Sequence, residues 1–298
     1  MSTIIDQASG PNWTAIHGDS AHAIGDLPDA SVDFSVYSPP FVDLFVYSTS
    51  AADLGNCASK DQFFEQYRHI IRQVKRVTKP GRLTAVHCTD LPTRKYRDGY
   101  IGINAFSDQV REAHEAEGWI YHCRITIWRD PVVEMQRTKA LGLLYKQLCK
   151  DSAMSRVGLA DYLLVFRNDG DNPTPVGKDR AQFPVDLWQK WASPVWMDID
   201  QTDVLNGRTA RESDDERHVC PLQLDLIERA VRLWSNPGET VLSPFMGIGS
   251  EGWSSIKAKR RFVGCELKES YWKQACKNLA LADQTFSGGD LLSGLEVA

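Results

Sequence analysis

The chain has 298 residues, 42% of them hydrophobic, with a formal net charge of −5. This length suits one large α/β domain with an inserted or appended lobe better than two equal domains. No apolar run approaches the roughly 18 residues of a membrane span, and the first residues lack the features of a signal peptide, so we expect a cytoplasmic protein with no membrane partner. The negative charge excludes a chain that is basic throughout, so any nucleic-acid surface must be local.

The seven cysteines are scattered along the chain. None forms a Cys-x-x-Cys pair, which argues against a disulfide framework and against a zinc site. We therefore predict reduced thiols, most of them in the core, and no bound metal.

Strands and helices are predicted to alternate along the first half of the chain. Strands are expected at 13–16, 32–37, 82–88 and 119–128, the last as a strand pair, and helices at 59–77 and about 105–117. In the clearest helix, Ser59 and Gln62 form a capping box, and Lys79-Pro80-Gly81 is expected to end it. This alternation is typical of a mostly parallel sheet.

The motif Ser38-Pro39-Pro40-Phe41 directly follows the apolar run at 32–37. Two prolines fix φ and remove two backbone donors, which leaves the carbonyl groups of Ser38 and Pro39 without ladder partners. Acceptors at the carboxyl end of a strand suit a ligand that presents an amino group, and Phe41 offers a face for a flat ring. A nucleobase has both features. The alternative is a plain Pro-Pro turn at the sheet edge.

The middle of the chain is locally basic. Between 129 and 156, six basic residues stand against three acidic ones: Arg129, Arg137, Lys139, Lys146, Lys150 and Arg156. We predict phosphate contacts here, the alternative being a solvated helix face. Further on, Trp188, Trp191 and Trp196 form either a buried corner or a surface for bases and backbone.

A glycine loop, Pro-Phe-Met-Gly-Ile-Gly at 244–249, separates a predicted strand from a predicted helix. Gly-x-Gly lets the backbone approach a ligand, and the helix N-terminus favours its negative end. The next strand, at 261–266, ends in Glu266, nineteen residues after Gly247, which is the spacing at which an acid takes ribose hydroxyls. The pattern predicts a nucleoside cofactor, without phosphates because the phosphate fingerprint is incomplete. The alternative is that Glu266 caps the final helix.

These two motifs resemble those of the DNA amino-methyltransferases. Ser-Pro-Pro-Phe at 38–41 looks like their catalytic motif, and the 244–249 loop looks like their loop for S-adenosylmethionine. The motif order is similar to that of the beta-class, circularly permuted enzymes, and the resemblance covers about residues 14 to 280. It implies an α/β fold, with a Rossmann-like mostly parallel sheet, helices on both faces and a smaller target-recognition lobe.

The resemblance also implies a division of the chain. It makes 1–128 the catalytic half of the methyltransferase domain, 129–216 the target-recognition region, 217–283 the cofactor-binding half and 284–298 a flexible tail. Double-stranded DNA is the implied partner, and a second copy of the chain is expected by analogy because the recognition lobe is short.

Site residues follow from the same resemblance. The catalytic residues would be Ser38, Pro39, Pro40 and Phe41. The cofactor would be held by Asp19 at its adenine amino group, His218 and Pro221 at its methionine end, Glu266 at its ribose, and Ser243, Phe245, Gly247 and Gly249 in the loop. DNA would be contacted by Arg129, Arg137, Lys139 and Arg156. The alternative for Asp19 is a helix N-cap.

Two positions depart from the family pattern. Ser243 stands where the family usually has Asp, which weakens the expected contact to the methionine amino group. Ser250-Glu251 stands where pairs of Thr or Ser are common.

We expect methyl transfer from S-adenosylmethionine to the exocyclic amino group of a flipped base in duplex DNA, either adenine N6 or cytosine N4. Methylation of RNA or of a protein glutamine, and a non-catalytic DNA-binding relative, are the alternatives. Cytosine-C5 chemistry would need a nucleophilic cysteine, and the one candidate, Cys220, lies outside the catalytic strand.

Overall fold

A central sheet organises the molecule, which is known here from a computed structural model that describes residues 4–40, 57, 59–93, 95–206 and 221–286. The strands of this sheet are β1 (Ile4–Gly10), β2 (Trp13–Gly18), β3 (Val32–Tyr37), β4 (Thr78–Thr89), β7 (Ile120–Ile127), β8 (Asp161–Arg167), β9 (Val195–Trp196), β10 (Thr240–Ser243) and β11 (Arg261–Glu266). They lie in the order β1-β2-β11-β10-β3-β4-β8-β7-β9. Two short strands, β5 (Leu91–Pro92) and β6 (Ile103–Asn104), pair separately.

The sheet is mostly parallel, as predicted. β2, β11, β10, β3 and β4 run parallel to one another, whereas β8 is antiparallel to β4 and β7, and β1 is antiparallel to β2. The chain leaves β3 toward β4 on one side and leaves β10 toward β11 on the other. Such a reversal of winding opens a crevice at the carboxyl ends of the two strands, where ligands bind in open α/β sheets.

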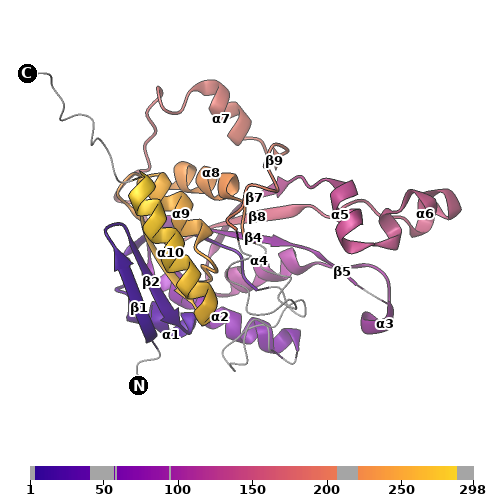
Figure 1. Cartoon of the computed structure of the whole chain (residues 1–298), viewed down its shortest axis with the longest axis horizontal. Coiled ribbons are helices and arrows are strands. Elements are labelled where there is room, and N and C mark those ends of the chain that lie inside the picture. Colours follow the sequence, from indigo (N-terminus) through magenta and orange to yellow (C-terminus); the bar gives the residue numbers. More distant parts are fainter. Residues whose placement is uncertain (1–3, 41–56, 58, 94, 207–220, 287–298) are drawn as a thin grey trace, which may run out of the picture.

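Helices cover both faces of the sheet (Figure 1). The described helices are α1 (Ser20–Ala23), α2 (Lys60–Val77), α3 (Lys95–Asp98), α4 (Phe106–Ala116), α5 (Pro131–Thr138), α6 (Tyr145–Lys150), α7 (Val185–Trp191), α8 (Leu224–Trp234), α9 (Ser250–Lys257) and α10 (Glu269–Phe286). Successive strand residues point to opposite faces. Accordingly, Phe34, Val36 and Val241 enter a core with α8, α9 and α10, and Tyr37 and Leu242 enter a second core with α1, α2 and α4.

The two ends of the described chain are neighbours. α10 packs against β1 and β2, as Figure 1 shows. The side-chain amide of Asn12 donates a hydrogen bond of 2.8 Å to Asp283 Oδ1. β2, near the start, pairs with β11, near the end. This adjacency is what a circularly permuted order of the same fold requires.

Two local predictions are wrong. The helix ends at Val77 as predicted, but the strand expected from residue 82 begins at Thr78, and β4 bulges between the pairs Val32–Thr78 and Phe34–Leu83. The stretch 119–128 contains one strand, β7, whose partners β8 and β9 come from later in the chain. The prediction that most cysteines are in the core is confirmed for the described ones: Cys88 and Cys265 are buried in it, Cys57, Cys123 and Cys276 are half-buried and pack against a core, and Cys149 is exposed.

The span predicted for target recognition shares the central sheet. β8 and β9 lie within 129–216 and pair in this sheet, whereas α5, α6 and α7 lie outside it (Figure 1). The division of the chain into catalytic, recognition and cofactor parts stays a prediction.

No helix in the described ranges is long and apolar enough to cross a membrane. Those ranges also contain no group of three or more His, Cys, Asp or Glu side chains that could hold a metal ion.

Candidate active site

The two predicted motifs meet at one edge of the sheet. β3 and β10 are adjacent and parallel, with Phe34 opposite Val241 and Ser35 opposite Leu242. Their carboxyl ends therefore lie side by side, and the ring of Phe245, after β10, is 5.9 Å from the ring of Tyr37, the last residue of β3. Residues more than 200 positions apart are thus placed at the switch point of the sheet.

Ser38 stands at the head of a chain of polar contacts that the sequence did not reveal. Its Oγ lies 3.5 Å from Nδ1 of His87 on β4. Nε2 of the same ring lies 3.5 Å from Oδ2 of Asp161 on β8, and Arg129 donates to Asp161 Oδ1 at 2.9 Å. Burial alone would raise the pKa of Asp161, but His87 and Arg129 lower it. The carboxylate therefore stays ionised and holds the imidazole toward Ser38.

The rest of the first motif is only partly described. Pro39 is buried and Pro40 half-buried, directly after Ser38. Phe41 lies outside the described residues, as does His218. Pro221 is half-buried just ahead of α8.

The glycine loop curls over the end of β11. Gly247 and Gly249 have φ of 51° and 90°, and a Cβ on Gly247 would meet no atom within 4 Å, so space is open above it. The amide of Gly247 donates to Glu266 Oε2 at 2.9 Å, and the amide of Lys268 donates to Oε1 at 2.8 Å. Glu266 thus joins the loop to the start of α10, and its ribose contact stays a prediction.

Asp19 closes the same edge at the end of β2. It is the N-cap of α1, accepting from the amide of Ala21 at 3.1 Å, and its other oxygen lies 2.6 Å from Nδ1 of His22. The N-cap alternative is therefore confirmed, and the contact to the cofactor's adenine stays a prediction. The neighbouring Ser20 Oγ donates to the carbonyl oxygen of Pro244, which ties β2 to the glycine loop.

Several buried polar atoms at this edge have no hydrogen-bond partner in the described structure. They include Ser243 Oγ at the end of β10, Ser250 Oγ at the start of α9 and Gln223 Oε1 just before α8. Buried polar groups are normally paired, and leaving one unpaired costs free energy. Such atoms beside an open glycine loop fit a bound group that brings its own donors and acceptors, as the adenosine and amino-acid ends of S-adenosylmethionine do.

Two of the basic residues predicted to contact DNA form ion pairs within the protein. Arg129 pairs with Asp161, and Arg156 donates to Glu134 at 3.0 Å. Arg137 belongs to α5, whereas Lys139 is exposed at the C-terminal end of that helix. Of the three indoles, Trp191 and Trp196 are buried with the Arg229 guanidinium over both rings, and Trp188 is exposed. The tryptophan pair is therefore mainly a structural corner.

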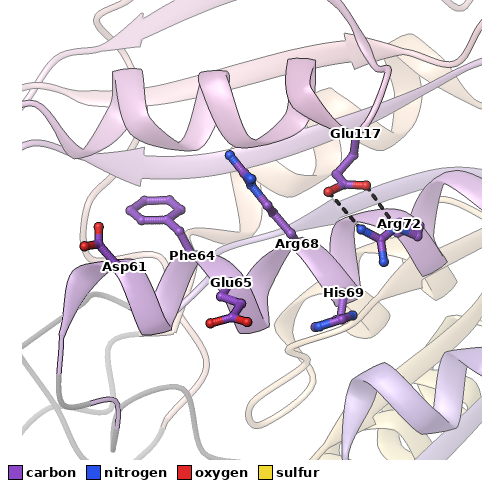
Figure 2. A pocket seen from close by; sticks show the side chains of 7 residues that line it. All are labelled: Asp61, Phe64, Glu65, Arg68, His69, Arg72 and Glu117. Carbon is purple, nitrogen blue, oxygen red and sulfur yellow. Dashed lines mark hydrogen bonds and ion pairs between the residues drawn. The ribbon is translucent and has the colours of Figure 1, made fainter.

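A separate pocket lies on the outer side of α2 (Figure 2). Its lining side chains are Asp61, Phe64, Glu65, Arg68, His69, Arg72 and Glu117. Arg72 and Glu117 close one end through a paired contact at 3.0 and 3.1 Å. None of the predicted site residues lines this pocket.

The fold and the edge at β3 and β10 define a Rossmann-like enzyme that uses a nucleoside cofactor. A family model described as DNA methylase, of the type that modifies adenine N6 or cytosine N4, matches residues 32–277. The chain therefore belongs to this family.

Relatives agree with this assignment. The chain is 39% identical to the type II methyltransferase M1.MboII of Moraxella bovis over 71 residues, 24% of the chain and 26% of that protein. It is 25% identical over 276 residues to the DNA adenine methyltransferase YhdJ of Escherichia coli, 90% of the chain and 83% of that protein.

Solved structures share the fold. PvuII DNA methyltransferase, which is cytosine-N4-specific, superposes with a TM-score of 0.65 at 14% identity, over 96% of this chain and 97% of that one. The chain also superposes on TTHA0409, a putative DNA modification methylase from Thermus thermophilus in complex with S-adenosyl-L-methionine. The TM-score is 0.65 at 22% identity, over 89% of this chain and 94% of that one. These structures confirm the predicted fold. The family match confirms amino-methylation of DNA at adenine N6 or cytosine N4, with S-adenosylmethionine as the cofactor.

Proposed function

We propose that the edge formed by β3 and β10 is where this methyltransferase holds the flipped base and the cofactor. The observation that carries the proposal is the pairing of β3 with β10, because it sets Ser38 beside the glycine loop. A direct transfer needs the amine and the methyl group within near-attack distance, and adjacent strand ends supply a rigid frame for that.

Ser38 and Pro39 would hold the amine. An exocyclic base amine is a weak nucleophile because its lone pair is delocalised into the ring. The Ser38 hydroxyl and the carbonyl groups of Ser38 and Pro39 are acceptors that occupy its two hydrogens and leave the lone pair free, while Pro40 fixes the turn. Phe41 would stack on the flipped base, and such stacking contributes about 1–3 kcal/mol.

His87 would position Ser38 and take up the proton. The Asp161 carboxylate favours the tautomer with the proton on Nε2, which leaves Nδ1 as an acceptor for the Ser38 hydroxyl. When the bond from nitrogen to the methyl carbon forms and the bond from sulfur to that carbon breaks, the sulfur keeps the electron pair. The nitrogen then carries a positive charge and loses a proton, for which Ser38 and His87 offer a route.

S-adenosylmethionine supplies an electrophilic methyl group on a sulfonium centre. Glu266 would take its ribose hydroxyls, Asp19 its adenine amino group, and His218 and Pro221 would line its methionine end. The open space over Gly247 leaves room for it to lie against the loop, with Ser243, Phe245 and Gly249 around it.

DNA would be bound on the recognition side of the molecule, 129–216. Lys139 is the exposed candidate for a phosphate contact, with Arg137 on the same helix. Arg129 and Arg156 already form ion pairs with Asp161 and Glu134, respectively. Their contacts with phosphate groups would therefore be weaker. A DNA substrate is consistent with work in the cytoplasm.

A second copy of the chain would complete the grip on DNA. The arm that contains α5 and α6 exposes large apolar side chains, including Leu141, Tyr145 and Leu148. Light scattering with and without duplex DNA tests this part of the proposal. A species of one chain under both conditions would overturn it.

The proposed roles are tested by methyl transfer from labelled S-adenosylmethionine to duplex DNA. His87→Ala should bind the cofactor normally and slow the transfer. Transfer at the normal rate would remove His87 from the mechanism. RNA and protein serve as control substrates.

A further inference from the structure

Glu251 is a buried acid without a cationic partner among the described residues. It lies in the first turn of α9, two residues after Gly249, and only 4% of the residue's surface is exposed. Asp and Glu are almost never fully buried unless they are paired. The Glu251 carboxyl accepts a hydrogen bond from its own backbone amide. A buried carboxyl without a cation at a ligand-binding edge still needs an explanation.

Its surroundings face the carboxyl end of β10. Val241 enters the core with α8, α9 and α10, so the side chain two positions later, Ser243, points to that same side of the sheet. One helical turn after Glu251, Ser254 Oγ donates to the carbonyl oxygen of Leu224 at 3.3 Å. Since residues three apart share a helix face, Glu251 lies toward the start of α8.

Unpartnered hydroxyl groups stand on both sides of the glycine loop. Ser243 is fully buried and Ser250 is 2% exposed, and neither Oγ has a hydrogen-bond partner in the described structure. Gln223 Oε1, just before α8, is likewise buried and unpartnered. Ser243 directly precedes the glycine loop, and Ser250 and Glu251 directly follow it, so the acid and the two hydroxyl groups flank one loop as a polar subsite with unused bonding capacity.

Among the groups of the cofactor, the amino-acid end suits this subsite best. It carries an ammonium, which needs a carboxylate, and a carboxylate, which needs hydroxyls or backbone donors. We propose that Glu251 binds the α-ammonium group of S-adenosylmethionine, with Ser243 and Ser250 beside it, an inference that rests on the proposed function. Ser243 cannot supply a charge there, whereas Glu251 reaches the subsite from the adjacent helix.

The protonation of Glu251 is consistent with this role. Burial and the nearby Glu266 raise its pKa to about 8. At neutral pH the carboxyl of the free enzyme is mostly protonated, which spares the fold an unpaired charge. Arrival of an ammonium stabilises the ionised form, so cofactor binding should release a proton.

Glu251→Gln tests the proposal by calorimetry. The variant should bind S-adenosylmethionine at least about tenfold more weakly, because a charge-assisted pair is removed. It should bind the deaminated analogue, with hydrogen in place of the amino group, as wild type does. Proton release, measured in two buffers of different ionisation enthalpy, should fall from nearly one proton to nearly none. Glu112→Gln, an exposed acid on α4, is the matched control.

A second variant separates a binding role from a folding role. In Ser243→Asp/Glu251→Gln the acid moves from α9 to the end of β10, and we expect recovery of most of the missing affinity and of the preference for the amino group. Equal affinity of wild type and Glu251→Gln for the cofactor, with equal discrimination against the analogue, would overturn the role of Glu251 alone. Failure of wild type to bind the cofactor at all would overturn the proposed function as well.

Discussion

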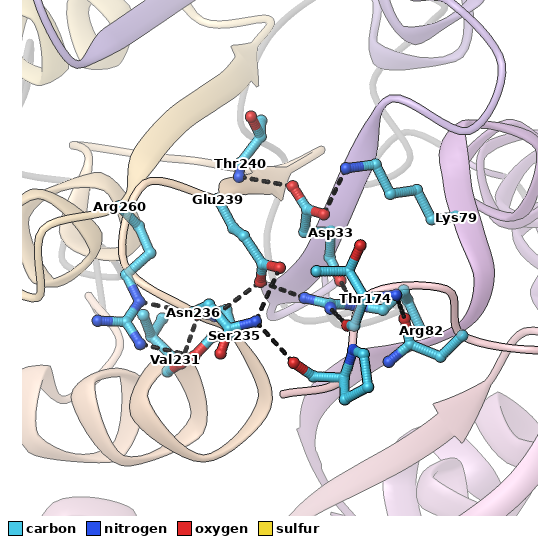
Figure 3. A network of polar contacts seen from close by, with 12 residues as sticks. Asp33, Lys79, Arg82, Thr174, Val231, Ser235, Asn236, Glu239, Thr240 and Arg260 are labelled. Carbon is cyan, nitrogen blue, oxygen red and sulfur yellow. Dashed lines mark hydrogen bonds and ion pairs between the residues drawn. The ribbon is translucent and has the colours of Figure 1, made fainter. Parts of the chain in front are cut away.

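Polar groups are paired at one end of the central strands and partly unpaired at the other; we call these ends the amino edge and the carboxyl edge of the sheet. At the amino end of β3 and β10, Asp33, Arg82 and Glu239 form a network whose members satisfy one another (Figure 3). At the carboxyl end of the same strands, Ser243 Oγ and Ser250 Oγ have no hydrogen-bond partner in the described structure.

The amino-edge network is closed by side chains from distant parts of the chain. Arg82 is 2% exposed and donates to the carbonyl oxygens of Asp33 and Thr174 at 2.9 and 3.0 Å, besides its contact with Glu239. Asp33 in turn accepts from the amide of Thr240 at 2.9 Å and pairs with Lys79. Closed networks of this kind stabilise a fold, whereas open polar groups at the other edge are suited to a ligand.

The largest effect should come from breaking the closed edge. Arg82→Leu removes the buried guanidinium and leaves the half-buried Glu239 without its ion-pair partner, and breaking a buried pair costs about 3–5 kcal/mol. Urea unfolding should show this loss. Arg111→Leu, which removes a more exposed pair with Glu115, should cost at most about 1 kcal/mol. Similar losses for both variants would show that the network has no special role.

The open edge should make stability depend on pH. The pKa of Glu251 is raised from 4.5 to about 8, so the native state holds its proton more tightly than the unfolded chain. Below about pH 4.5 both states hold the proton, so Glu251 adds no pH dependence. Between about pH 4.5 and 8 the free energy of unfolding falls by about 1.4 kcal/mol per pH unit. Glu251→Gln should remove this slope in cofactor-free protein. A slope identical to that of wild type would mean that Glu251 is not the group responsible.

Substitution of Glu266 should lower the affinity for the cofactor more than it lowers the free energy of unfolding. Glu266→Ala should weaken S-adenosylmethionine binding by about 1.5–3 kcal/mol, through loss of charged hydrogen bonds, and leave DNA affinity nearly intact. Calorimetry on the folded variant measures this. An unchanged affinity would restrict Glu266 to joining the glycine loop and α10.

Much of each edge could be predicted from local sequence. The bounds of β3 and β11 match the predicted strands, because apolar runs bounded by turns are local signals. Short sequence motifs likewise identify the glycine loop and Ser38 as candidate site residues. The contacts of His87 with Asp161, and of Arg82 with Glu239, join residues 74 and 157 positions apart, and only the antiparallel placement of β8 and the pairing of β3 with β10 create them.

The smallest effect concerns DNA phosphates. Neutralising Lys139 and Lys150, both exposed, should reduce the slope of log affinity against log salt by about 0.9 for each phosphate group that these lysines bind in wild type. Binding of duplex DNA at several salt concentrations gives this slope. The same slope in variant and wild type would assign the basic stretch to an ordinary solvated face.

The most direct test of the account is the mass of the nucleosides released from DNA after incubation with the enzyme and S-adenosylmethionine. Wild type should yield N6-methyladenosine or N4-methylcytidine in the deoxy form, since both amines fit the acceptors at Ser38. Ser38→Ala, with cofactor binding intact, should yield about a hundredfold less of the same product, because the amine is no longer positioned. Formation of 5-methylcytosine, or equal yields from both proteins, would contradict the assignment of the amine to the open edge.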